Sequence, residues 1–181
     1  MSKLNVPTEH NGIKLTTVTS EIAVDASAEA IWDALSHFGD VASFHSGVRT
    51  STPTEGFSDV AALGTERICK VPDGKREVTL VERITDFSEG EYYRYEVYEW
   101  KNFPLQAMFF AFEIVEKGSG KRVLQLSQHY RLKPGFLTRP MKYKIRQQQR
   151  TILLGYKHYI ETGEKNVATS DIAGEVLVLT S

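Results

Sequence analysis

The chain has 181 residues, of which 41% are hydrophobic and 25% charged, and its formal net charge is −1. These proportions are those of an ordinary globular protein, and a nearly neutral charge gives no general attraction to nucleic acid. The single cysteine, Cys69, excludes an intrachain disulfide and suits a reducing compartment. There is no run of 18 apolar residues and the first twelve residues are polar, so we expect neither a membrane span nor a signal peptide. The sequence therefore predicts a single-domain cytoplasmic protein.

The first elements are predicted to be a strand and two short helices. Residues 1–12 are expected to form a loose arm, and the β-branched residues of 13–25 predict a long strand. Ser27 is a suitable N-cap for a short amphipathic helix that ends at Gly39. A second short helical turn is expected over 41–44.

Six segments with strand patterns follow, separated by turns and without helices between them. Strands joined by such short connections pair in antiparallel fashion. Pro72-Asp73-Gly74 is one of the turns, because proline presets φ and glycine accepts a positive φ. The six segments are 48–53, 64–71, 77–87, 92–100, 105–116 and 122–132.

The longest helical pattern covers 138–162, and Gly163 is a suitable residue to end it. Its apolar residues recur on one helix face: Met141, Ile145, Ile152, Tyr156 and Tyr159. The tail 164–181 is polar until VLVLT at 176–180, which is expected either to add an edge strand or to be disordered. We expect a ligand-binding domain over 1–163 and a separate tail after it.

This order of elements predicts an α+β fold in which a curved, seven-stranded antiparallel sheet wraps around the long helix. Neighbouring strands are rotated by about 20–25°, and a helix about 10–12 Å across cannot fill the hollow of such a sheet. Gln148 and Gln149 interrupt the apolar face of the helix, and Gly155 lacks a side chain there, which favours a cavity. Alternatively, Gly155 lets the helix approach the sheet closely, and the glutamines lie at the flank of the apolar face.

The alternation of side chains along the strands predicts their two faces. In 122–132, one side carries Leu124, Leu126, Tyr130 and Leu132, and the other carries Gln125, Ser127, His129 and Arg131. The segment 105–116 is apolar on both sides, so it is either buried on both or lines an apolar cavity. Either side can be the concave one.

Several sequence segments occur together between residues 14 and 162: AEAIWDALSHFGD, FHSGV, GTERICKVPDG, LVERITDF, FPLQAMFFAFEI and HYRLKPG. In this order they resemble the SRPBCC (START and pollen-allergen-like) helix-grip superfamily, and within it the bacterial polyketide cyclase/dehydrase and lipid-transport branch. The resemblance implies a hydrophobic ligand cavity between the long helix and the sheet. Some relatives are aromatase/cyclases, and others bind or carry lipids, quinones, hormones or plant metabolites.

Arg67 and Glu82 lie at comparable distances from the Pro72–Gly74 turn and can meet across the hairpin. As a functional pair, Arg67 would bind a carboxylate or enolate oxygen that Glu82 positions; otherwise they form a cross-strand ion pair, worth at most about 1 kcal/mol if exposed. His45 and His129 can transfer protons near neutral pH. There is no complete catalytic constellation, and the catalytic candidates are Arg67, Glu82 and His129.

We expect the protein to bind or transport a small hydrophobic ligand, such as a lipid, a quinone or a polyketide-like compound. The alternatives are a cyclase, aromatase or dehydratase acting on a polyketide-like or aromatic substrate, and a partner-binding module. No Cys/His cluster, HExxH, GxGxxG or P-loop motif is present, so no metal and no cofactor are expected. The residues expected to contact the ligand are Phe44, His45, Arg67, Glu82, Tyr95, Phe110, Gln148, Ile152 and Tyr156.

The long helix carries six basic residues between Arg139 and Lys157. They are expected either to form a solvated face or to contact an anionic membrane surface transiently while a lipid is loaded.

Overall fold

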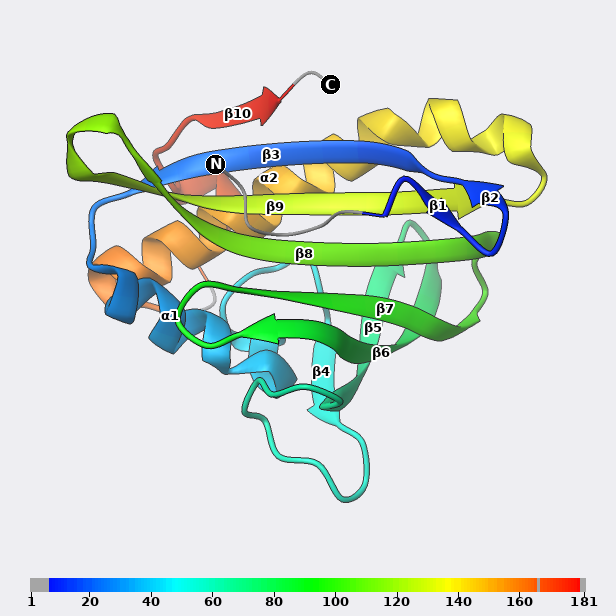
Figure 1. The fold of residues 1–181 in the computed structure, drawn as a ribbon, viewed down its shortest axis with the longest axis horizontal. Coiled ribbons are helices and arrows are strands. Elements are labelled where there is room, and N and C mark those ends of the chain that lie inside the picture. Colours follow the sequence, from blue (N-terminus) through cyan, green and yellow to red (C-terminus); the bar gives the residue numbers. More distant parts are fainter. Residues whose placement is uncertain (1–6, 166, 180–181) are drawn as a thin grey trace.

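An eight-stranded antiparallel sheet and one long helix make up most of the fold (Figure 1). The structure is a computed structural model that describes residues 7–165 and 167–179. The strands lie in the order β10-β3-β9-β8-β7-β6-β5-β4. They are β3 (Thr16–Val24), β4 (Thr50–Pro53), β5 (Glu66–Asp73), β6 (Arg76–Ser88), β7 (Tyr92–Lys101), β8 (Leu105–Lys117), β9 (Lys121–Leu132) and β10 (Val176–Leu179).

The predicted α+β helix-grip fold is confirmed, but the sheet has eight strands instead of seven. The additional strand is β10, which pairs with Thr19–Ile22 of β3 at the edge of the sheet. This short apolar segment thereby gains backbone partners that its sequence pattern alone did not assign.

A small hairpin, β1 (Glu9–His10) with β2 (Ile13–Lys14), covers part of the outer face of the sheet. Strand β1 lies within the predicted loose arm, of which residues 1–6 fall outside the described residues, and β2 takes the first two residues of the long strand predicted over 13–25. The ring of His10 packs edge-on against Phe109 of β8, with 4.9 Å between ring centroids. Both sides of strand β8 are therefore covered, which explains why its residues are apolar on both sides.

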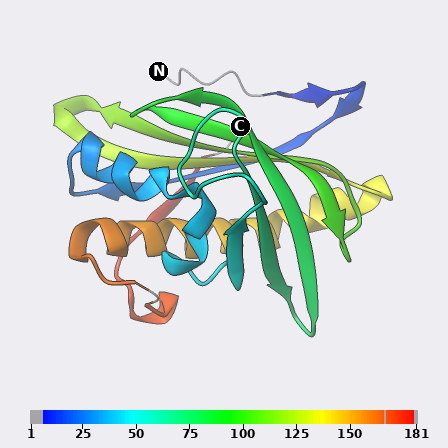
Figure 2. The same cartoon turned by 90° about the horizontal axis from the view of Figure 1, so that it is seen from below.

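Two helices occupy the inner face of the sheet (Figure 2). Helix α1 (Ala28–Ser36) begins at Ser27, whose hydroxyl accepts a hydrogen bond from the Ala30 amide at 3.2 Å. Helix α2 (Thr138–Thr162) has the predicted bounds, and Gly163 ends it with a φ of +78°, a left-handed conformation that favours glycine. The shorter 3₁₀ helices are η1 (Phe38–Ser43), η2 (Gly118–Gly120), η3 (Gly135–Leu137) and η4 (Thr169–Asp171).

The second half of α2 packs against the loop that follows η1. A Cβ atom on Gly155 would lie 2.5 Å from the Cβ of His45 and 2.6 Å from the carbonyl oxygen of Phe44. The ring of Tyr156 stacks on Phe44 and meets Phe112 edge-on, both with centroids 5.6 Å apart. Gly155 thus permits a close approach, as one alternative predicted, but the helix approaches this loop and not the sheet.

Gln149 joins α2 to β3. Its side chain is fully buried, donates a hydrogen bond to the carbonyl oxygen of Val18 at 2.9 Å and accepts one from the Ser20 hydroxyl at 2.7 Å. Gln149 lines neither of the voids described below, so the expectation that it faces a cavity is wrong. Its amide is used to position the helix on the sheet.

The sheet separates between β7 and β8 at one end. Within the residues that the structure describes, these strands pair only from Tyr92–Glu96 to Phe109–Glu113. Strand β7 continues to pair with β6 as far as Lys101, and β8 with β9 as far as Leu105. The two parts of the sheet thus diverge next to the first half of α2. Across the described ranges, no helix combines the length and the apolar character needed to cross a membrane.

Candidate functional site

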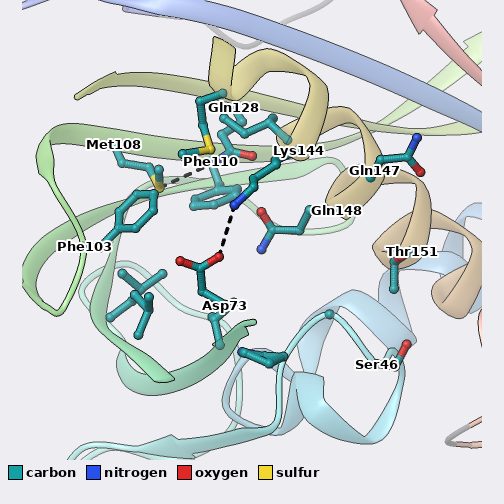
Figure 3. A pocket seen from close by; sticks show the side chains of 17 residues that line it. Ser46, Asp73, Phe103, Met108, Phe110, Gln128, Lys144, Gln147, Gln148 and Thr151 are labelled. Carbon is teal, nitrogen blue, oxygen red and sulfur yellow. Dashed lines mark hydrogen bonds and ion pairs between the residues drawn. The ribbon is translucent and has the colours of Figure 1, made fainter. Parts of the chain in front are cut away.

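A cavity of about 360 Å³ lies between the first half of α2 and strands β5, β6, β8 and β9 (Figure 3). Ligand pockets usually have volumes of roughly 300–1,000 Å³, so this one suits a compact molecule. Most of its wall is apolar: Val71, Val78, Leu80, Phe103, Met108, Phe110, Met141 and Ile145.

An ion pair connects two walls of the cavity on its solvent side. Lys144 of α2 lies 3.4 Å from the carboxylate of Asp73, at the end of β5 (Figure 3). Both side chains are exposed, and exposed ion pairs contribute only about 0–1 kcal/mol to stability. The ion pair can therefore open at small cost when a molecule enters or leaves.

A second, smaller void of about 20 Å³ extends from the cavity toward the interior. It shares Phe110 and Gln148 with the cavity, which places the two side by side. A volume of about 10–15 Å³ is enough for one water molecule. The other predicted site residues that line it are His45, Arg67, Glu82, Tyr95, Ile152 and Tyr156.

Arg67 and Glu82 lie opposite each other on β5 and β6, as their distances from the turn predicted. Arg67 Nε donates to Glu82 Oε2 at 2.5 Å, and Arg67 Nη1 donates to the carbonyl oxygen of Phe38 at 2.6 Å. Each residue is only 3% exposed. The two form a cross-strand ion pair, but a buried one, so the limit expected for an exposed pair does not apply to it.

Two neighbours of this ion pair stay uncharged near pH 7. Burial raises the pKa of the Cys69 thiol to about 12. Burial, together with the nearby positive charge of Arg67, lowers the pKa of His45 to about 3. His45 Nδ1 has no hydrogen-bond partner within the described chain. A histidine with so low a pKa is a poor proton shuttle at neutral pH, but it can still exchange a hydrogen bond with a bound molecule.

His129 lies on the other face of the sheet. It is fully buried, and its Nδ1 is 2.8 Å from the hydroxyl of Thr17. Burial and the charge of Arg94 lower its pKa to about 4. The structure therefore does not bring His129 together with Arg67 and Glu82.

The aromatic candidates take different places. Tyr95 stacks on Phe110 with ring centroids 5.0 Å apart, and burial raises the pKa values of Tyr95 and Tyr156 well above their usual range. The hydroxyls of Tyr93 and Tyr156 lie close enough for each to influence the pKa of the other. Neither has a hydrogen-bond partner of ordinary geometry among the described residues. Phe44 packs on Tyr156 and lines neither void.

Sequence reasoning missed Gln128, a polar residue in the cavity wall. It is 1% exposed, and its amide nitrogen donates to the sulfur of Met108 at 3.6 Å. The alternation along 122–132 contained the signal, because Gln128 falls in the same row as Leu126 and Tyr130 and is the polar member of that row. The Asp73–Lys144 ion pair was also missed, because it joins segments that are far apart in sequence.

No group of three His, Cys, Asp or Glu side chains is placed to hold a metal ion in the described ranges. The two voids together form a mostly apolar enclosure with a few amide, imidazole and hydroxyl groups in their walls. Such a site can bind and orient a small apolar molecule.

Comparisons with solved structures find the same fold. Ara h 8.0201 is 16% identical over 82% of this chain and 99% of its own, with a TM-score of 0.65. The protein XoxI from Bacillus cereus is 19% identical over 81% of this chain and 96% of its own, with a TM-score of 0.65. Ginseng major latex-like protein 151 from Panax ginseng is 15% identical over 83% and 97%, with a TM-score of 0.62.

No curated protein matches the sequence significantly. The family described as "Polyketide cyclase / dehydrase and lipid transport" matches residues 16–160, which include the sheet from β3 to β9 and nearly all of α2. The chain therefore belongs to this family, within the SRPBCC superfamily of helix-grip proteins.

Proposed function

We propose that the protein binds and carries one small hydrophobic molecule, such as a lipid, a quinone or a polyketide-like compound, in the cavity beside α2. The observation that carries this proposal is the cavity of about 360 Å³, whose wall is mostly apolar and whose solvent side is crossed by a weak ion pair. Residues 1–163 form the ligand-binding unit of the proposal, and 164–181 are an appended tail. The free, buried thiol of Cys69 is consistent with a protein that functions in the reducing cytoplasm.

The second candidate function is a cyclase, aromatase or dehydratase, which the family description supports by naming polyketide cyclase activity. Such an enzyme needs a positioned acid or base and a group that stabilises negative charge on the substrate. Arg67 and Glu82 are engaged with each other, and the void beside them has room for about one water molecule. This geometry supports carriage over turnover. Conversion of a poly-β-ketone by wild-type protein, with loss of turnover in His45→Asn, would favour the enzyme.

Loading from an anionic membrane surface is a further part of the proposal. Phe136 of η3 and Tyr143 of α2 are 76% and 70% exposed, close in sequence to the basic residues Arg139, Lys142 and Arg146 of α2. Positive charge at a helix N-terminus interacts unfavourably with the helix dipole. Its presence at the start of α2 therefore favours a role in binding anions. Exposed aromatic rings among basic side chains are typical of surfaces that bind anionic lipid.

Binding of the dye anilinonaphthalene sulfonate tests the carrier function. Val78 lies in the cavity wall and is 4% exposed, so Val78→Trp fills part of the cavity and is expected to weaken binding at least tenfold. Leu63→Trp adds the same side chain at a position that is 68% exposed and lines neither void, and it should bind as the wild type does. Equal binding by both variants would contradict the proposal. Native mass spectrometry of the protein from its own host would identify a co-purifying compound.

A further inference from the structure

Gln128 places a buried amide in the apolar wall of the cavity. Strand β9 points this residue toward α2, opposite Phe110 of β8 in the sheet register. Both residues line the cavity, and Figure 3 shows them together with Met108 in its upper wall. With 1% of its surface exposed, Gln128 must find hydrogen-bond partners inside the protein.

The hydrogen bonds of this amide are incomplete. Its nitrogen donates to the thioether sulfur of Met108 at 3.6 Å, and sulfur is a weak acceptor. Its oxygen, Oε1, has no partner anywhere in the described parts of the chain. If the Gln128 amide were rotated by 180°, so that its oxygen and nitrogen exchanged places, the oxygen would face the Met108 sulfur and the hydrogen bond to that sulfur would be lost. The unmatched atom is therefore the oxygen, and because a buried acceptor without a partner is destabilising, it requires a donor.

A water molecule is a poor candidate for that donor. Buried waters make about three hydrogen bonds to polar groups, whereas the side chain that the Gln128 amide contacts is Met108, and the residues opposite Gln128 on β8 and β3 are the apolar Phe110 and Val18. An apolar molecule with a single hydroxyl needs only the one acceptor that Gln128 offers, because the rest of the molecule packs against the apolar wall. Phe103 and Phe110 in the same wall suit an aromatic ring.

We infer that the cavity selects a compact aromatic molecule with a phenol-type hydroxyl, which donates its hydrogen bond to Gln128 Oε1. This inference rests on the proposed carrier function and makes Gln128 its specificity-determining residue. The oxygen has almost no exposed surface, so a neighbour must move to admit the hydroxyl. Met108 can do so, because its unbranched thioether side chain repacks readily.

A matched pair of probes tests the inference. 2-Naphthol and 2-methoxynaphthalene differ only in whether the oxygen carries a hydrogen or a methyl group, and both can be titrated calorimetrically and in competition with anilinonaphthalene sulfonate. Wild-type protein is expected to bind 2-naphthol about fivefold to tenfold more tightly, as one neutral hydrogen bond of about 1 kcal/mol provides. Gln128→Leu is expected to bind both probes equally. Gln125→Leu, on the same strand but facing outward, should keep the wild-type preference.

The outcomes separate the inference from the function on which it rests. Equal affinity of wild-type protein for the two probes, or an undiminished preference in Gln128→Leu, overturns the inference alone. Failure of both probes and of the dye to bind overturns the carrier function and the inference together. Gln128→Met serves if the leucine variant does not fold, because it keeps the chain length and removes the acceptor. Since it also removes an unmatched polar atom, it should unfold at the same or a higher urea concentration than wild type, and a large loss of stability would contradict the inference.

Discussion

The two halves of α2 face the same sheet and differ in what lies between helix and sheet. Beside the second half, aromatic rings from η1, β7, β8 and the helix itself fill the space, with Tyr156 in contact with Phe44 and Phe112. Beside the first half, Ile145 and Gln148 border the cavity. A single helix is narrower than the hollow of the curved sheet along its whole length. A cavity therefore remains only where large side chains do not fill the space between helix and sheet.

The helix sequence reflects this contrast. Its second half carries three consecutive buried apolar residues, Ile152 to Leu154, followed by Gly155, which allows the close approach to the η1 loop. Its first half alternates basic and amide residues with single apolar ones. The packed half provides stability and leaves the open half free to bind a molecule.

The largest effect is expected for Glu82→Ala, which tests whether the buried Arg67–Glu82 ion pair is part of the packed interior beside the second half of α2. Removing one partner leaves the charge of Arg67 buried and unpaired, so stability should fall by about 3–5 kcal/mol, measured by urea unfolding. The double variant Arg67→Met/Glu82→Leu should recover most of this loss, because apolar groups of similar volume often replace a buried pair without cost. A loss below about 1 kcal/mol together with abolished dye binding would instead assign the pair to the ligand site.

Acidification is expected to destabilise the protein through its two buried histidines, one beside each face of the sheet. The pKa values are about 3 for His45 and about 4 for His129 in the folded protein, and about 6.5 for histidine in an unfolded chain. Below pH 6.5 the unfolded chain therefore binds protons that the folded protein does not. Stability should be full above this pH and fall by about 2–4 kcal/mol between pH 7 and pH 5, measured by urea unfolding at each pH.

His129→Gln should remove about half of this pH dependence, because only His45 then distinguishes the folded and unfolded states. An unchanged slope in a variant lacking both histidines would show that other groups cause it.

Gly155→Ala tests the close contact of the packed half. The added methyl group meets backbone atoms of Phe44 and His45, which cannot move aside as a flexible side chain can. We expect a loss of about 1–2 kcal/mol, although alanine favours a helix by about 1 kcal/mol over glycine. Gly118→Ala is the matched control, because a Cβ atom there has no neighbour within 4 Å. A stabilised Gly155→Ala variant would contradict the close contact.

The smallest effect is expected at the surface of the open half. Arg139→Gln should weaken binding to phosphatidylserine vesicles about fivefold, since one basic residue near an anionic surface contributes about 1 kcal/mol. Vesicle co-sedimentation measures this, and stability should stay within about 0.5 kcal/mol of wild type. Lys121→Gln makes the same charge change at the start of β9, and a loss of binding equal to that of Arg139→Gln would argue against a localised docking surface.

Much of the fold could be predicted from local patterns. The bounds of α2 and the meeting of Arg67 with Glu82 follow from helical periodicity and from counting outward from a turn. Strand β10 could not be assigned, because four apolar residues become a strand only when an edge such as that of β3 accepts them.

The candidate site was less predictable. Alternation separates the two faces of β9 but does not say which one is concave, so His129 was grouped with residues that lie across the sheet. Burial of the Arg67–Glu82 pair and the contact between Asp73 and Lys144 depend on how distant segments pack. Local sequence carries no direct signal for either.

The incomplete pairing of β7 with β8 gives the cavity a wall that can yield. Beyond Glu96, β7 is attached along β6 only, and β6 is in turn attached to β5. At this end the described residues form no backbone ladder from β7 to β8, which are joined only through the connection 102–104, so this wall can shift outward by a small amount while the connection stays intact. A protein built in this way can adjust the cavity wall to the outline of the bound molecule while its packed half remains unchanged.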